Sequence, residues 1–143
     1  MTAGDSVELS SPNYPLFYPD NARCTWWLHS NAPGSYVIHF LHFDTEVDQD
    51  WLIVARDSAG HGVPPENNVI YQVSSFVPSH VVVVIEESYI WILFQSDHGV
   101  KGKGFQLQVE RIDTIGKYDT NLKCGFQRLI MYILINISML LLD

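Results

Sequence analysis

The chain has 143 residues and a formal net charge of −8, since 16 Asp and Glu residues outnumber 8 Lys and Arg residues. The length suits one domain with a sizeable core, and the negative charge argues against a nucleic-acid-binding protein while favouring cations or basic partner proteins. Aromatic residues make up 13% of the chain, and together with abundant Val and Ile they favour strands over helices.

Turn-forming residues and apolar runs alternate over roughly the first 111 residues. The proline-containing segments 11–15 and 18–21 are typical of loops. No convincing amphipathic helix precedes residue 112. Strands are predicted over residues 24–30, 35–43, 51–55, 69–73, 80–86, 89–95 and 105–110.

The sequence also predicts the surroundings of two of these strands and the form of one connection. Residues 35–43 are apolar on both faces, which indicates a buried position. Residues 105–110 alternate apolar and polar side chains, which is typical of a half-buried antiparallel strand. The segment Glu86-Glu87-Ser88 resembles a tight hairpin connection, although it lacks the preferred Asn-Gly. Short strands separated by frequent turns predict an all-β fold, an antiparallel β-sandwich.

The character of the chain changes after Ile112, so we expect a domain over residues 1–112. Residues 113–128 are mostly polar and predict a linker, and residues 129–143 form an apolar tail outside the core, with a possible helix. As a helix, residues 129–142 would reach about 21 Å, short of the roughly 30 Å hydrocarbon core of a membrane. An unpacked or artefactual terminus, a helix packed on the domain and a membrane segment all remain open.

The two cysteines, Cys24 and Cys124, are too few for a disulfide-built scaffold and lack a neighbour at zinc-ligand spacing. The first residues show no basic region followed by an apolar run, so no signal peptide is expected in them. This fits a cytosolic protein and, equally, a fragment of a longer secreted chain.

Four carboxylates occur within the seven residues from Asp44 to Asp50. Carboxylates repel one another by about 1 kcal/mol per close pair even in water, so a bound cation such as Ca²⁺ would explain the cluster. A solvated acidic turn is the alternative. An EF-hand loop is excluded, because its Gly and Glu positions hold Gln49 and Ala55. No pair of acids is singled out as a glycosidase pair.

Histidines and tryptophans offer further candidates. The six histidines are scattered, and the nearest pair, His39 and His42, should point to opposite faces of a strand. We therefore expect packing roles rather than zinc binding or catalysis, and no Ser or Cys nucleophile motif accompanies them. At least two of the four tryptophans should be core, and an exposed one would suit a sugar ring.

Several motifs occur in the order found in CUB domains, which this chain resembles from about residue 4 to residue 112. The opening signature of that family resembles Ser11-Pro12-Asn13-Tyr14-Pro15, Tyr18-Pro19 and Cys24-Thr25-Trp26. Its two-phenylalanine motif and its closing motif resemble Phe40-Leu41-His42-Phe43-Asp44-Thr45-Glu46 and Ser96-Asp97 followed by Gly104-Phe105. The resemblance implies a compact antiparallel β-sandwich, a CUB-like jelly roll.

In calcium-binding members of that family, acids at one end of the sandwich hold Ca²⁺. The resemblance carries the ligand roles to Glu46, Asp50 and Asp97. It implies that Tyr18 hydrogen-bonds the first of these acids, Glu46. Supporting roles fall to Asp44 and Asp48, which would raise the local negative potential, and to the carbonyl groups near His98 and Gly99.

The chain departs from the family pattern in its cysteines and its acidic loop. The usual second cysteine pair is absent, and the acidic loop is shorter than is common. The family partner of Cys24 is an upstream cysteine that this chain lacks, and a disulfide between Cys24 and Cys124 is conceivable. These departures affect the loop geometry on which calcium affinity depends.

The resemblance implies a non-catalytic, extracellular protein-interaction module, which belongs to a longer precursor and binds Lys or Arg of a partner through Ca²⁺-ordered acids. A parent protein of this kind can contain a protease domain. A carbohydrate-binding sandwich is the alternative function, and an enzyme using the acidic cluster is a third hypothesis.

Overall fold

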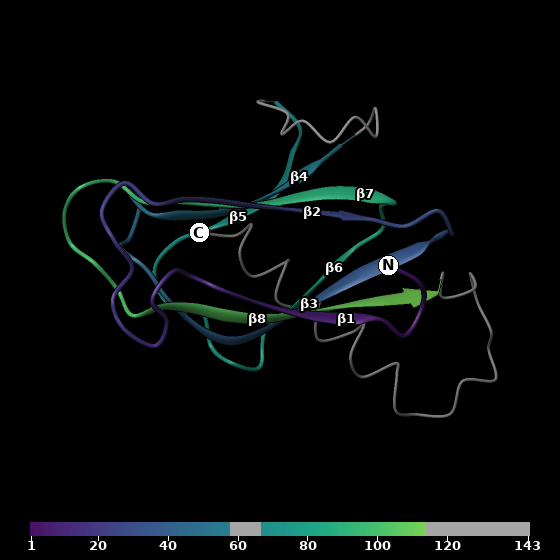
Figure 1. The fold of residues 1–143 in the computed structure, drawn as a ribbon, viewed down its shortest axis with the longest axis horizontal. Coiled ribbons are helices and arrows are strands. Elements are labelled where there is room, and N and C mark those ends of the chain that lie inside the picture. Colours follow the sequence, from purple (N-terminus) through teal and green to yellow (C-terminus); the bar gives the residue numbers. More distant parts are fainter. Residues whose placement is uncertain (58–66, 114–143) are drawn as a thin grey trace, which may run out of the picture.

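Two four-stranded antiparallel sheets pack face to face in the computed structural model, which describes residues 1–57 and 67–113 (Figure 1). One sheet has the order β1–β8–β3–β6, formed by Ser6–Ser10, Gly104–Asp113, Gly34–Asp44 and Val82–Ile85. The other has the order β2–β7–β4–β5, formed by Arg23–His29, Tyr89–Gln95, Trp51–Arg56 and Val69–Val73. The predicted antiparallel β-sandwich is confirmed.

The predicted strands agree with seven of the eight observed strands, with small differences at their ends. The strand that the sequence analysis missed is β1, which pairs along its length with β8 at the edge of the first sheet. Strand β8 continues to Asp113, and the rest of the predicted linker and the apolar tail lie outside the described residues. Within the described ranges, no helix is long and apolar enough to cross a membrane.

The hairpin predicted at Glu86–Ser88 is wrong. Strand β6 pairs with β3, whereas β7 pairs with β2 and β4, so this connection crosses from one sheet to the other. Its carbonyl groups are used in the crossing, since Ser88 O accepts hydrogen bonds from the Ser30 N–H at 2.9 Å and the Tyr36 hydroxyl at 3.1 Å. Both flanking strands can then turn apolar side chains toward one shared core.

A bulge changes the expected orientation of two histidines. The register of β3 against β8 shifts between Phe40 and His42, so that His39 lies opposite Gln108 and His42 opposite Gln106. Residues two apart on β8 share a face, and therefore both histidines lie on the same face of the sheet, not on opposite faces. His39 Nε2 lies 3.7 Å from Glu110 Oε2, and the ring of His42 contacts the ring of Tyr14.

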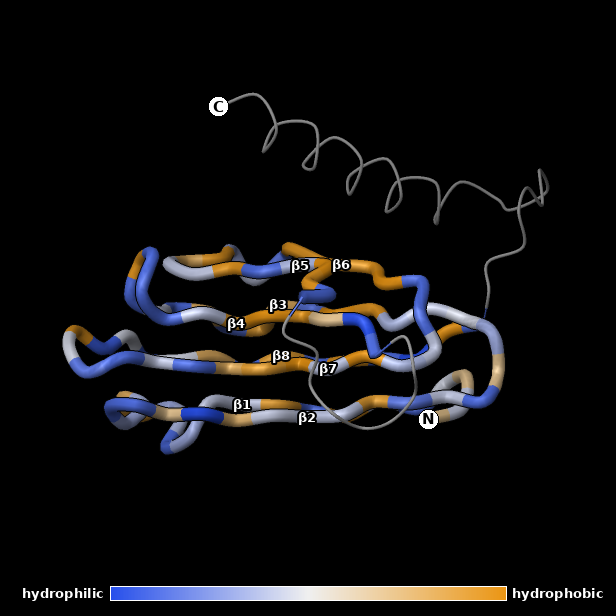
Figure 2. The backbone as a smooth tube through the Cα atoms, turned by 90° about the horizontal axis from the view of Figure 1, so that it is seen from above, coloured by the Kyte–Doolittle hydropathy of each residue, from blue (hydrophilic) through white to orange (hydrophobic). Residues whose placement is uncertain are grey.

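The core is built from inward-facing side chains of both sheets, and Figure 2 shows hydrophobic residues concentrated along the strands. Phe94 of β7 and Phe105 of β8 meet edge to face across the sandwich, with ring centroids 5.1 Å apart. Phe43 stacks on Phe105, and Tyr18 packs edge-on against Phe94. These rings join the two sheets directly beneath the loops that carry the acidic residues.

Antiparallel strands that alternate in direction place alternate connections at the same end of the sandwich. The connections 11–22, 45–50, 74–81 and 96–103 follow β1, β3, β5 and β7 and gather at one end, which we call the loop end (Figure 1). Hydrogen bonds tie them together, among them Thr45 N–H to Ser75 O at 2.9 Å and Asn21 N–H to Asp97 O at 2.8 Å. Segments far apart in sequence therefore share one surface.

We predict that Phe105→Ala lowers the free energy of unfolding by about 3–5 kcal/mol, because it opens a cavity between the two sheets. Phe76→Ala is the matched control, since this side chain is 67% exposed and its loss should change the free energy by less than about 0.5 kcal/mol. Urea denaturation of the two variants measures the difference. Equal effects would contradict the assignment of Phe105 to the core.

Candidate metal site

Three carboxylates from two connections converge at the loop end. Glu46 and Asp50 come from the connection 45–50 and Asp97 from the connection 96–103, and one oxygen of each lies within 4.8 Å of the others. Asp97 is 47 positions from Asp50 in the sequence, so the fold, rather than local spacing, assembles this group. Carboxylate oxygens in this number are the ligands that hard divalent cations prefer.

Asp50 is the buried anchor of the group. Its side chain is fully buried, and both of its oxygens are hydrogen-bonded: Oδ2 accepts from the Tyr18 hydroxyl at 2.5 Å, and Oδ1 accepts from the Asp97 N–H at 2.9 Å. A buried charge is tolerated only when it is well hydrogen-bonded. Asp50 thus holds the connection 96–103 against its own connection.

Glu46 and Asp97 each leave one oxygen without a partner. Glu46 Oε2 and Asp97 Oδ1 are both shielded from solvent and accept no hydrogen bond. The two atoms border the same space beside Gly99, because a Cβ at Gly99 would lie 3.4 Å from Asp97 Oδ1 and 3.6 Å from Glu46 Oε2. Buried acceptors without partners are rare and costly, and a divalent cation would satisfy both. The residues present therefore fit Ca²⁺.

The electrostatics of the group agree with this fit. Partial burial, and then the negative charges of Asp97 and Asp50, raise the pKa of Glu46 above its usual value. The contribution of Asp97 and Asp50 to this shift reflects repulsion among the three carboxylates. A cation at this position would offset that repulsion.

Tyr18 supports the group, although not through the predicted acid. Its hydroxyl donates to the carboxylate of Asp50, not of Glu46, and it contacts Glu46 by accepting the backbone N–H at 3.1 Å. The same oxygen accepts the Gly102 N–H at 2.9 Å. Asp50 takes this donor because it is the fully buried acid. Burial and the bond to Asp50 raise the pKa of Tyr18 to about 12, so the phenol remains a donor at neutral pH.

The other predicted supporting residues lie around the group. Asp44 Oδ2 accepts the Lys103 N–H at 3.3 Å, and Asp48 has a left-handed backbone (φ 58°) with its N–H bonded to Ser74 Oγ. Asp44 and Asp48 therefore shape the loops and are not among the three converging acids. His98 and Gly99 are exposed next to Asp97, and the ligand role of their carbonyl groups stays a prediction.

Sequence reasoning missed two contacts that fix the connection 96–103. A Cβ at Gly102 would collide with the backbone of Asp44, so this close approach requires glycine. Lys101 pairs with Asp20 at 2.9 Å, which joins the connection 96–103 to the connection 11–22. The run Gly102-Lys103-Gly104 was the available signal for the first contact, because glycines that flank a strand often mark close backbone approach.

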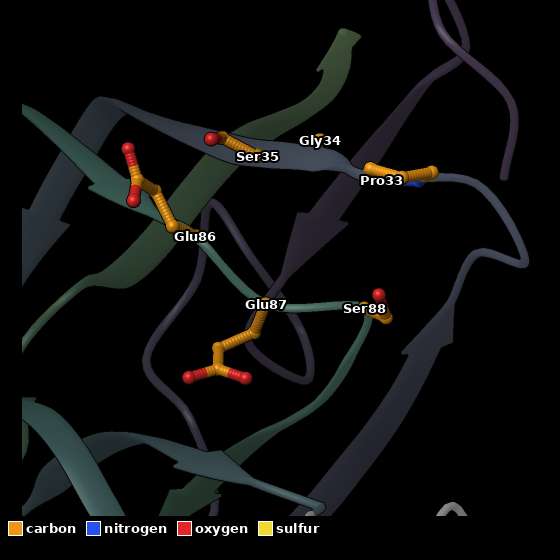
Figure 3. Close-up of a pocket in the computed structure, with 6 residues that line it drawn as sticks. All are labelled: Pro33, Gly34, Ser35, Glu86, Glu87 and Ser88. Atoms are coloured by element: carbon orange, nitrogen blue, oxygen red, sulfur yellow. The ribbon is translucent and has the colours of Figure 1, made fainter. Parts of the chain in front are cut away.

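A hollow of about 290 Å³ lies at the opposite end of the sandwich (Figure 3). It is lined by residues 33–35 and 86–88, and the carboxylates of Glu86 and Glu87 point in different directions. Glu87 pairs with Arg56 at 2.5 Å, and its carbonyl accepts from the buried Arg111 at 2.7 Å. With Glu87 already paired, this hollow does not resemble the acidic group at the loop end.

Cys24 lies partly buried in β2 and is not in a disulfide within the described part of the chain. Burial raises the pKa of its thiol. Cys124, the partner considered for it, lies outside the described residues, so that pairing stays a prediction.

The family model of the CUB domain matches residues 2–109. The chain belongs to the CUB domain family. CUB domains are generally non-catalytic, extracellular protein-interaction modules, which agrees with the coarse function expected from the sequence.

Curated relatives contain this domain as a small part of a longer chain. Cubilin of Sus scrofa is 33% identical over 110 residues, which cover 73% of this chain and 3% of cubilin. The signal peptide, CUB and EGF-like domain-containing protein 2 of Danio rerio is 27% identical over 103 residues, which cover 69% of this chain and 10% of the relative. The chain thus spans a small fraction of the relatives that it matches.

Solved structures show the same fold. The CUB1-EGF-CUB2 domain of human MASP-1/3 matches with a TM-score of 0.63 and 22% identity, covering 76% of this chain and 42% of that one. The MASP-1 CUB2 domain bound to Ca²⁺ matches with a TM-score of 0.59 and 18% identity, covering 76% of this chain and 94% of that one. At these identities the likeness concerns the fold.

We predict that Tyr18→Phe lowers the free energy of unfolding by about 1–3 kcal/mol, because it removes a donor from the buried Asp50 and an acceptor from two backbone N–H groups. Tyr14→Phe is the control, since the ring contact of Tyr14 with His42 needs no hydroxyl. Chemical denaturation measures both variants. A Tyr18→Phe protein as stable as Tyr14→Phe would show that these hydrogen bonds do not hold the loop end together.

Proposed function

We propose that this chain is an extracellular, Ca²⁺-dependent protein-binding domain, in which Glu46, Asp50 and Asp97 hold the ion and the acidic loop end binds a Lys or Arg of a partner protein. The observation that carries the proposal is the pair of shielded oxygens without partners, Glu46 Oε2 and Asp97 Oδ1, beside the buried Asp50. The Ca²⁺-bound MASP-1 CUB2 domain, which shares the fold, supports it.

Bound Ca²⁺ would supply positive charge among three carboxylates and would satisfy the two oxygens that lack partners. The residues of the chain position the ligands around the ion. Asp50 and Tyr18 join the connections 11–22, 45–50 and 96–103, so a ligand that draws Glu46 toward Asp97 would tighten all three.

A basic partner side chain suits the charge of this end. Asp48 lies on the connection that carries Glu46 and Asp50, and Asp44 directly precedes that connection. Both add negative potential there. A Lys or Arg would form charge-assisted hydrogen bonds with such acids. Contacts of this kind weaken as salt increases, and chelation of Ca²⁺ would remove the order on which they depend.

We predict that the full chain binds Ca²⁺ in isothermal calorimetry and that Asp97→Asn weakens binding at least about tenfold, because affinity follows the number of charged ligands. Asp48→Asn is the matched control. It removes the same charge, and Asn tolerates the left-handed backbone at this position (φ 58°), so affinity should change little. The proposal fails if the wild-type chain shows no Ca²⁺ binding or if the two variants lose affinity equally.

We also predict that Ca²⁺ at about 100 times its dissociation constant stabilises the fold by about 2.7 kcal/mol, since the ion binds only the folded chain. Thermal unfolding with Ca²⁺ and with chelator measures the effect. The amide chemical shifts of Asp97 and Gly102 should change when Ca²⁺ is added, while that of Ser30, at the opposite end, should not. Equal changes across the domain would argue against ordering confined to the loop end.

A carbohydrate-binding sandwich is the second candidate, and Trp27 is the residue that favours it. Trp27 is 37% exposed on the outer face of β2, stacked against His29 and Trp91, with its indole N–H bonded to Asp57. A ring fixed in this way can pack on a sugar. A glycan array with the wild-type chain and Trp27→Ala tests this function. Signals that do not depend on Trp27 would exclude Trp27 as the sugar-binding residue.

A further inference from the structure

Large apolar side chains project from the same loops that carry the acids. The five that are at least 59% exposed there come from all four connections of the loop end, and we call them the apolar collar: Leu16, Phe17, Val47, Phe76 and Val100. Exposure of this degree means that they contribute little to the stability of the core.

The collar is specific to the loop end. The other large exposed hydrophobic residues of the described ranges lie within strands: Trp27, Leu41, Val69 and Ile70. The described residues of the opposite connections, 30–33, 67–68 and 86–88, contain none. Scattered surface hydrophobics need no explanation, but several on the connections of one end are a candidate for an interaction surface.

Backbone contacts place the collar next to the candidate metal site. Val47 follows Glu46 directly, and Phe17 precedes Tyr18, whose hydroxyl bonds Asp50. Val100 follows Gly99, which borders the oxygens without partners, and Phe76 forms a backbone bridge with Asp44. Each acid-bearing connection therefore also presents an apolar tip.

Charge decides which partner this combination fits. With Asp44 included, the loop end has six carboxylates and two lysines, so it remains negative even with a bound divalent cation. An anionic membrane surface would be repelled by this charge. A cationic side chain is attracted, and the collar adds apolar surface around it.

We propose that the apolar collar selects a partner segment in which a Lys or Arg is flanked by apolar side chains. The inference rests on the proposed function, because the acids receive the basic group, and it adds the part of the partner that the collar would contact. The flanking side chains of the partner pack on Phe76, Val100 and the other side chains of the collar. That packing excludes water from the ion pair and strengthens the ion pair.

The test uses the full chain in Ca²⁺ and two synthetic peptides, one with a central lysine between leucines and one with serines in place of the leucines. Titration followed by NMR should give at least about tenfold tighter binding of the leucine-flanked peptide, the effect of burying a small apolar area. The double variant Phe76→Ser, Val100→Ser should lose this preference while its calorimetric Ca²⁺ binding is unchanged.

The control variant is Val69→Ser with Ile70→Ser, which removes exposed apolar side chains from β5 (48% and 38% exposed) and should keep the preference. Equal affinity for the two peptides, no binding of either, or a preference that survives in the Phe76 and Val100 variant would overturn the inference. Collar-dependent binding to phosphatidylserine vesicles without a peptide preference would also overturn it, in favour of a lipid surface. A chain that binds no Ca²⁺ yet prefers the leucine-flanked peptide would refute the calcium site and keep the collar.

Discussion

The loop end depends on one interaction, the buried carboxylate of Asp50 held between the Tyr18 hydroxyl and the Asp97 N–H. A carboxylate that is fully buried must find donors within the protein, and here the donors come from two other connections. Because the ring of Tyr18 also packs edge-on against Phe94 at 5.2 Å, the aromatic core sets the position of these acids. The loops are thus arranged by the same packing that joins the two sheets.

The buried cation Arg111 and the carboxylates of the loop end differ in how their polar atoms are satisfied. At the opposite end, Arg111 is 1% exposed, yet it donates to the carbonyls of Ala32 and Glu87 at 2.7 Å and lies over the ring of Tyr36. At the loop end, acceptors on Glu46 and Asp97 lack donors, and apolar side chains face solvent. Folding alone favours neither feature, and the proposed binding role would explain why both occur at one end.

Sequence patterns predicted what depends on local periodicity and failed where pairing partners decide. The clean alternation over residues 105–110 identified β8, whereas β1 was missed because only Val7 and Leu9 are apolar in a five-residue edge strand. The supposed hairpin at 86–88 and the faces of His39 and His42 depended on which strand pairs with β6 and on a bulge in β3. Neither is a local property of the sequence.

In the candidate site, too, local patterns predicted only part of what the fold brings together. Spacing alone left four equivalent acids between Asp44 and Asp50, and family resemblance was needed to add the distant Asp97, since no local rule joins residues 47 positions apart. The collar escaped prediction for a related reason. An apolar residue in a turn-rich segment, such as Phe76, has no periodicity that distinguishes a core side chain from an exposed one. The alternation of antiparallel strands is what carries such residues to one end, where their exposure beside unsatisfied acids becomes informative.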